Sequence, residues 1–242
     1  MKKLLLILTI LITSACSKQA TIPAQPPTVT TPQPDNMPAS HSFTYLALGD
    51  SYTIGEAVPQ AQSFPYQLTQ RLKNTNNPDI IAVTGWTTGE LKQGIAQRAL
   101  SNHNYDIVTL LIGVNNQYRG YNKEAYRTEF TELLNTAIAY ANGNKKHVFV
   151  LSIPDWGVTP FGKNSGDPAK IAADIDTFNA INKQETDMLG VAYVDITPIS
   201  RQAAYDTDLV ASDGLHPSGK MYSLWVNELL SLVTAQVKHG SD

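Results

Sequence analysis

Short apolar segments alternate with longer helical patterns along most of this chain, and this alternation constrains the fold more than any other feature of the sequence. The apolar segments are rich in Val, Ile, Leu and aromatic residues, which is typical of strands buried on both faces. We expect five strands, at residues 43–49, 80–84, 107–113, 148–153 and 191–196. We expect helices at residues 63–73, 88–100, 123–141, 169–189 and 218–237. Strand followed by helix, repeated five times, predicts one α/β domain with a parallel sheet covered on both faces.

The residues before this domain have a different character. Two lysines and an apolar run over residues 4–12, too short to span a bilayer, are typical of a secretory signal peptide, which we expect to cover residues 1–15. Residues 16–42 carry six prolines and no aromatic residue, which predicts an extended tether. We expect the folded domain at residues 43–238 and a short tail at 239–242.

Cys16 is the only cysteine of the chain and directly follows the expected signal peptide. The segment resembles a bacterial lipoprotein signal, whose cysteine becomes the acylated first residue, although Thr13 stands where such signals usually carry leucine. This resemblance implies an exported protein anchored to a membrane surface by lipid at Cys16, on the periplasmic side or the cell surface. Plain cleavage after Ala15 is the alternative.

Two short segments at opposite ends of the predicted domain contain three residues that can act together in hydrolysis. Residues 49–51 (Gly-Asp-Ser) follow the first strand, and residues 213–217 (Asp-Gly-Leu-His-Pro) precede the last helix. A serine hydroxyl becomes a good nucleophile when an imidazole accepts its proton, and the imidazole needs a carboxylate to fix its tautomer. Ser51, His216 and Asp213 supply these groups. Taken alone, the second segment also fits a turn that caps the last helix.

Four segments resemble, in order, the signature blocks of the SGNH, or GDSL, hydrolase family. They are Gly-Asp-Ser-Tyr-Thr-Ile-Gly at 49–55, Val-Thr-Gly-Trp-Thr-Thr at 83–88, Gly-Val-Asn-Asn at 113–116 and Asp-Gly-Leu-His-Pro at 213–217. The resemblance implies a flavodoxin-like three-layer α/β/α sandwich and the hydrolysis of carboxylic esters without a metal or organic cofactor. It also implies that Ser51 is the nucleophile, His216 the general base and then acid, and Asp213 the partner of His216.

The resemblance further implies an oxyanion hole made by the backbone N–H groups of Ser51 and Gly85 and the side-chain amide of Asn115. These residues follow the first three strands, and the carboxyl ends of parallel strands border the ligand crevice, so we expect them to lie together. In isolation, Gly85 and Asn115 fit ordinary turn residues equally well. Asn116 stands where the family usually has aspartate, and Tyr52 where it usually has leucine. Neither position transfers a proton, so these departures bear on substrate preference and not on the chemistry.

Four aromatic residues, Trp86, Tyr118, Trp156 and Phe161, fall in segments expected at the rim of this crevice. They can form a platform for a sugar ring or a wall for an acyl chain, and ordinary loop packing explains them as well. An exported esterase can remove acetyl or acyl groups from polysaccharides or hydrolyse lipid esters at a membrane. A catalytically silent surface lipoprotein that binds carbohydrate or peptide in the same crevice is the alternative from another class.

Composition and motifs argue against several other classes. The formal net charge is −3 and no Lys/Arg-rich block occurs, so we expect no nucleic-acid partner. The sequence has no His-Glu-x-x-His pattern and no cysteine pair, so we expect no metal site. Residues 157–164 resemble a phosphate-binding loop, but Asn164 replaces the Ser or Thr that holds magnesium and no helix is expected to follow directly. We interpret this segment as a loop on the substrate side.

Overall fold

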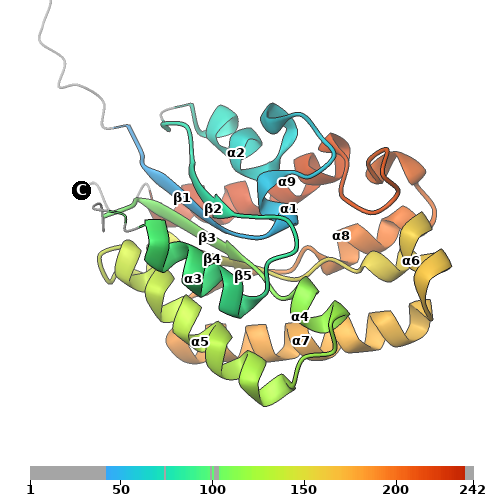
Figure 1. Ribbon diagram of the computed structural model, residues 1–242. Coiled ribbons are helices and arrows are strands. Elements are labelled where there is room, and N and C mark those ends of the chain that lie inside the picture. The colour runs from blue at the N-terminus through green and yellow to red at the C-terminus, as the bar shows by residue number, and fades with distance from the viewer. Residues whose placement is uncertain (1–41, 74, 99, 101–103, 238–242) are drawn as a thin grey trace, which may run out of the picture. The chain divides into compact units, whose positions relative to one another are not determined.

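The computed structural model describes residues 42–73, 75–98, 100 and 104–237. The expected signal peptide, the tether up to residue 41 with Cys16, and the C-terminal tail lie outside these residues. Five parallel strands form one sheet in the order β2-β1-β3-β4-β5, as Figure 1 shows. Their bounds are Tyr45–Gly49 (β1), Asp79–Ala82 (β2), Ile107–Leu111 (β3), Val148–Leu151 (β4) and Ala192–Val194 (β5). The predicted five-stranded parallel sheet is therefore confirmed.

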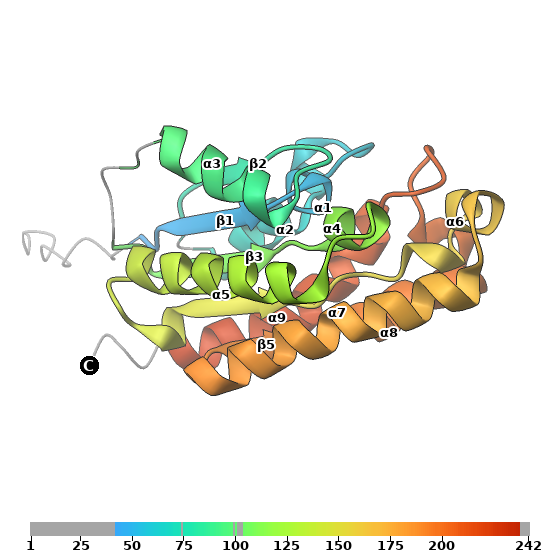
Figure 2. The ribbon, with the colours of Figure 1, turned by 60° about the horizontal axis from the view of Figure 1, so that its bottom comes forward.

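Helices cover both faces of the sheet, so the predicted three-layer arrangement is confirmed too. On one face α3, α5 and α7 lie side by side (Figure 2), and on the other α2 packs along α9. The long helices are Phe64–Leu72 (α2), Thr88–Arg98 (α3), Lys123–Tyr140 (α5), Pro168–Leu189 (α7) and Gly219–Val237 (α9). In the part of the chain that the structure describes, no helix combines the length and apolarity that crossing a membrane requires.

The core forms because the central strands are apolar on both faces. Every residue of β1 and β3 is buried, and the one polar side chain of β3, Thr109, is hydrogen-bonded to the Tyr45 hydroxyl at 2.8 Å. The helices contribute one face each: the buried side chains of α9 recur at intervals of three or four residues. These buried side chains are Met221, Tyr222, Trp225, Val226, Leu229, Val233 and Val237. The sheet is thereby held as a rigid platform for the segments at its carboxyl edge.

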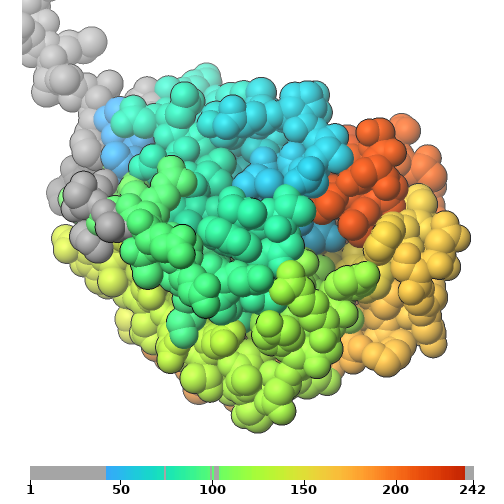
Figure 3. Space-filling model, viewed as in Figure 1, coloured from blue at the N-terminus to red at the C-terminus, as the bar shows by residue number. Residues whose placement is uncertain are grey.

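Short helices stand at that edge, where the sequence predicts loops. They are Ser51–Ile54 (α1), Val114–Tyr118 (α4), Pro160–Ser165 (α6) and Thr197–Arg201 (α8). The expectation of a loop over residues 157–164 is wrong, because a 3-10 helix covers Trp156–Val158 and α6 follows it. Thr159 caps α6 by accepting the Gly162 N–H, and Pro160 occupies the first helical turn. In the space-filling view, the segments near residues 120, 160 and 210 adjoin one another on one side of the molecule (Figure 3).

Candidate active site

Ser51 is presented by a tight connection between β1 and α1. Asp50 caps α1, accepting the N–H of Tyr52 at 3.0 Å, and Ser51 is the first residue of the helix. A side chain at position 49 would overlap the Thr53 side chain and the carbonyl oxygen of Leu111, so only glycine fits there. The connection therefore fixes Ser51 at the carboxyl end of the central strand, with its side chain largely buried.

His216 approaches Ser51 from a turn 165 residues later in the chain. Its Nε2 lies 3.1 Å from Ser51 Oγ, and its Nδ1 lies 2.5 Å from Oδ2 of Asp213. The other carboxylate oxygen of Asp213 accepts the backbone N–H groups of Leu215 and His216, at 2.9 and 3.0 Å. A carboxylate beside Nδ1 places the ring proton there, which leaves the Nε2 lone pair facing the serine hydroxyl. The structure thus brings the three predicted triad residues together.

The turn around Asp213 keeps its carboxyl charged. Burial alone raises the pKa of Asp213, but hydrogen bonds from the His216 ring and from the N–H groups of Leu215 and His216 outweigh burial and hold this pKa below its usual range. The backbone can make this turn because Gly214 adopts a φ of +74°, in the left-handed region that glycine tolerates best. An ionised Asp213 stabilises the imidazolium that forms when His216 takes a proton.

The segment between β2 and α3 carries Gly85, and α4 holds this segment in place. The side-chain amide of Asn115 donates to the Trp86 carbonyl at 3.0 Å, so its second N–H is left for a ligand. Arg119, just after α4, donates to the Gly85 carbonyl at 2.6 Å and pairs with Glu90 at 3.3 Å. Among the described residues no group accepts the N–H of Ser51 or Gly85, as an oxyanion hole requires.

Asn116 completes the attachment of this segment. Its Oδ1 accepts the Thr88 N–H at 3.0 Å and its Nδ2 donates to Thr88 Oγ1 at 2.7 Å. The Thr88 hydroxyl in turn donates to Glu129 on α5. Asn116 and Thr88 are fully buried. The family usually has aspartate at position 116, and such an aspartate would accept the proton of the Thr88 hydroxyl. In this protein Glu129 accepts that proton instead.

Three of the four predicted rim aromatics line one pocket with Ser51 and His216. The pocket has a volume of about 170 Å³. Its lining residues are Ser51, Tyr52, Val114, Asn115, Tyr118, Trp156, Phe161, Leu215 and His216. Trp86 does not belong to it: its indole packs over Gly94 of α3, where any side chain would overlap the ring, and lines a separate cleft with Val83 and Arg98.

Sequence reasoning missed the supporting residues. Arg119, Glu129 and Gln117 act through contacts with distant segments, and no local pattern marks such contacts. The sequence marks Tyr52 only as a departure from the family, whereas in the structure its ring packs against His216 with the ring centres 5.4 Å apart. Among the described residues, no three His, Cys, Asp or Glu side chains cluster as a metal site needs.

Comparison with solved structures reveals the same fold. TesA is 15% identical, with a TM-score of 0.63 over 80% of this chain and 99% of that one. A member of the lipolytic protein G-D-S-L family from Veillonella parvula is 16% identical, with a TM-score of 0.62 over 79% and 98% of the chains. Axe2, an acetylxylan esterase from Geobacillus stearothermophilus, is 15% identical, with a TM-score of 0.58 over 79% and 94%.

Sequence comparison identifies the family. A search of curated proteins gave no match. The model of the family described as GDSL-like Lipase/Acylhydrolase matches residues 47–224, which is most of the chain and contains Ser51, Asp213 and His216. The chain therefore belongs to the GDSL-like lipase/acylhydrolase family and is an ester-bond hydrolase.

Proposed function

We propose that the protein hydrolyses carboxylic esters in two steps, through an acyl-enzyme on Ser51. In the first step, the Ser51 hydroxyl gives its proton to His216 Nε2 while Oγ bonds to the carbonyl carbon. The tetrahedral intermediate then breaks its bond to the alcohol oxygen, which takes the proton from His216 and leaves. In the second step, water gives a proton to His216, its oxygen bonds to the acyl carbon, and Ser51 Oγ leaves with that proton.

The single observation that carries this proposal is the distance of 3.1 Å between Ser51 Oγ and His216 Nε2. This is hydrogen-bonding range for proton transfer, and the contact with Asp213 orients the imidazole for it. The developing charge on the substrate oxygen needs donors that are already in place, and the N–H groups of Ser51 and Gly85 with the Asn115 amide fit that role.

Labelling with a fluorophosphonate probe tests the proposal. An activated serine attacks the phosphorus, fluoride leaves, and a stable adduct forms on Oγ. We expect wild type to be labelled and Ser51→Ala to lose both the label and hydrolysis of p-nitrophenyl butyrate, the latter by about 10⁴-fold or more. Ser231→Ala, an exposed serine on α9, is the matched control and keeps both. Labelling that persists in Ser51→Ala, or an unreactive wild type, refutes the proposal; the latter result favours a binding protein.

We also propose that the enzyme is exported and held at a membrane surface by lipid on Cys16. The support lies in the sequence alone: the charged and apolar start, the cysteine at the expected cleavage point and the proline-rich tether of residues 16–42. At about 3.1 Å per residue in polyproline II conformation, such a tether reaches on the order of 80 Å from its anchor. Mass spectrometry of the mature protein checks this proposal. An unmodified Cys16, or another first residue, rejects it.

A further inference from the structure

The pocket beside Ser51 has a size that suggests its occupant. A buried apolar cavity of about 150 Å³ holds one benzene molecule. The pocket here, at about 170 Å³, therefore has room for about six or seven non-hydrogen atoms. An acetyl group would leave most of this space unfilled, and a long acyl chain would not fit within it.

The lining of the pocket distinguishes an acyl chain from a sugar. Apart from the hydroxyl groups of Tyr52 and Tyr118, the polar side chains on its wall that can bind a ligand are Ser51, Asn115 and His216, and each of these three has a place in the proposed chemistry. The remaining wall consists of aromatic and aliphatic side chains. Most of this surface offers a sugar hydroxyl no hydrogen bond in place of those it loses to water, whereas a hydrocarbon chain has none to lose. The acyl group is also the part of the substrate that stays bonded to Ser51 between the two steps.

Trp156 forms the inner wall of this pocket. Its side chain is 6% exposed, against 58% for Tyr118 and 37% for Phe161, so these two residues stand nearer the mouth. The Tyr118 ring meets the Trp156 indole edge-on with centres 5.5 Å apart, and the Phe161 ring lies at 6.0 Å. The indole N–H donates to Oε1 of Gln117 at 2.8 Å, which fixes the direction of the ring.

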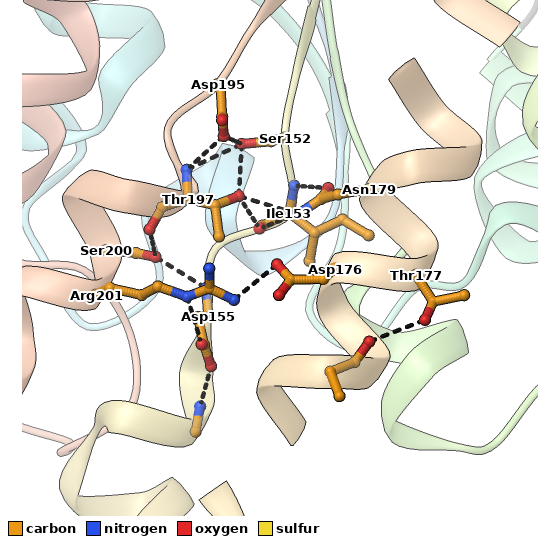
Figure 4. A network of polar contacts seen from close by, with 12 residues as sticks. Ser152, Ile153, Asp155, Asp176, Thr177, Asn179, Asp195, Thr197, Ser200 and Arg201 are labelled. Carbon is orange, nitrogen blue, oxygen red and sulfur yellow. Dashed lines mark hydrogen bonds and ion pairs between the residues drawn. The ribbon is translucent and has the colours of Figure 1, made fainter. Parts of the chain in front are cut away.

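The segment that carries Trp156 is also held in place, through a network of polar contacts around Asp155 and Arg201 (Figure 4). The preceding residue, Asp155, is buried; its N–H donates to Ser200 Oγ and its carboxylate accepts the Gly157 N–H, both at 2.9 Å. The same carboxylate pairs with Arg201 of α8 at 2.9 Å, and Arg201 pairs with Asp176 of α7 at 2.7 Å. Since two helices fix this segment, Trp156 is a stationary wall.

A second space lies behind this wall. Its volume is about 10 Å³, too small for more than one water molecule. It shares Tyr52, Trp156 and Leu215 with the first pocket and is otherwise lined by Pro154, Asp155, Thr159, Ser200, Pro217 and Met221. Trp156 therefore lies between the two spaces together with Tyr52 and Leu215, and we expect that trimming its indole lengthens the pocket toward the second space.

We propose that the pocket binds the acyl chain of the substrate and that Trp156 limits its length, so that esters of about four to six acyl carbons are preferred. This inference rests on the proposed acyl-enzyme mechanism, because the mechanism places the acyl carbon on Ser51 at the pocket's edge. Trp156 determines specificity by blocking the chain, and Gln117 acts through Trp156 as a positioning residue.

A series of p-nitrophenyl esters from acetate to dodecanoate tests the proposal, with kcat/KM measured for each. Wild type should be fastest with butyrate or hexanoate. In Trp156→Ala the ratio of octanoate to butyrate kcat/KM should rise about tenfold or more, because each newly buried methylene contributes about fourfold. Trp156→Phe and Gln117→Met should raise this ratio less. Tyr205→Ala, which removes an aromatic side chain that is 95% exposed, is the control and should leave it unchanged.

The ratio of octanoate to butyrate kcat/KM within one variant does not depend on how much of that protein is folded. If Trp156→Ala does not fold at all, Trp156→Phe and Gln117→Met still test the proposal. An unchanged ratio in these variants overturns the inference, while fluorophosphonate labelling of Ser51 still supports the proposed function. Absent labelling of wild type instead overturns both. A second series, acetate esters of alcohols of increasing length, identifies the occupant: an effect of Trp156→Ala on this series alone places the alcohol in the pocket and rejects the proposal.

Discussion

Replacing Asn116 with aspartate, the residue that the family usually carries, should damage this protein. In the present structure the Asn116 amide donates to Thr88 Oγ1, and the Thr88 hydroxyl donates to Glu129. An aspartate in place of Asn116 has no proton to donate at neutral pH. Thr88 has one hydroxyl proton for two carboxylates, so either the buried aspartate or the half-buried Glu129 loses its hydrogen bond to Thr88.

The cost follows from burial. Asn116 and Thr88 have no exposed surface, and an unpaired buried acceptor costs about 1–3 kcal/mol, more when it is charged. We therefore expect Asn116→Asp to lower the free energy of unfolding by about 3 kcal/mol, which in a domain of this size lowers Tm by about 6–12 °C. Glu129→Gln alone should cost less than about 1 kcal/mol, because the glutamine oxygen still accepts the Thr88 hydroxyl.

The double variant, Asn116→Asp with Glu129→Gln, should recover most of the loss. The hydroxyl of Thr88 then donates to the new aspartate, and the glutamine amide donates to Thr88 in return. A double-mutant cycle by thermal and chemical unfolding measures the coupling, which should be favourable and about 2 kcal/mol. The kcat of p-nitrophenyl butyrate hydrolysis should fall in Asn116→Asp and recover in the double variant, because the same segment carries Gly85. An unchanged Tm in Asn116→Asp, or strictly additive effects in the double variant, would refute this reasoning.

Three further predictions concern residues around Ser51. Asn115→Ala should lower kcat by about 10²–10³-fold without abolishing activity, because the two backbone donors remain; steady-state kinetics measure this loss. Arg119→Met should lower kcat about tenfold with little change in KM, since the Gly85 carbonyl loses its donor; a change in KM alone would contradict this role. Burial raises the pKa of Asp50 to about 7. Between pH 4 and 7 the unfolded chain has then released a proton that the folded chain keeps, so stability falls as pH rises, by up to about 4 kcal/mol. Asp50→Asn should remove this fall, and its Tm relative to wild type should rise from pH 4 to pH 8; a constant difference would show that Asp50 does not titrate in this range.

The central strands could be predicted because they are buried on both faces and therefore consist of unbroken apolar runs. The predicted strand at residues 107–113 contains β3, Ile107–Leu111, and that at 148–153 contains β4, Val148–Leu151. The predicted ends lie two residues too far, because Ile112 and Ile153 are buried beyond the last paired residue. Hydrophobicity therefore locates a strand but does not mark where its pairing stops.

The short helices and the partners of the aromatic side chains could not be predicted in this way. A helix of five residues, such as α4, is not stable by itself and forms only through its contacts with the rest of the fold. Trp86 and Trp156 look alike in the sequence, since each follows a strand. Gly94 has no side chain, so the Trp86 indole packs directly against the backbone of α3. The Trp156 indole instead donates a hydrogen bond to the Gln117 amide oxygen, which holds it in the pocket. These partners come from elsewhere in the chain.

The position of α4 connects catalysis with substrate selection. Within five consecutive positions, this helix and the residue after it contribute four side chains that hold other parts of the site in place. They are Asn115, Asn116, Gln117 and Arg119. Three of them attach the segment that carries Gly85, and the fourth fixes the inner wall of the proposed acyl pocket. Because one short helix bears both sets of contacts, a displacement of α4 must alter the oxyanion donors and the length of the pocket together. Substitutions that shift this helix should therefore change kcat and chain-length preference in parallel, whereas Trp156→Phe should change the preference with much less effect on kcat for butyrate.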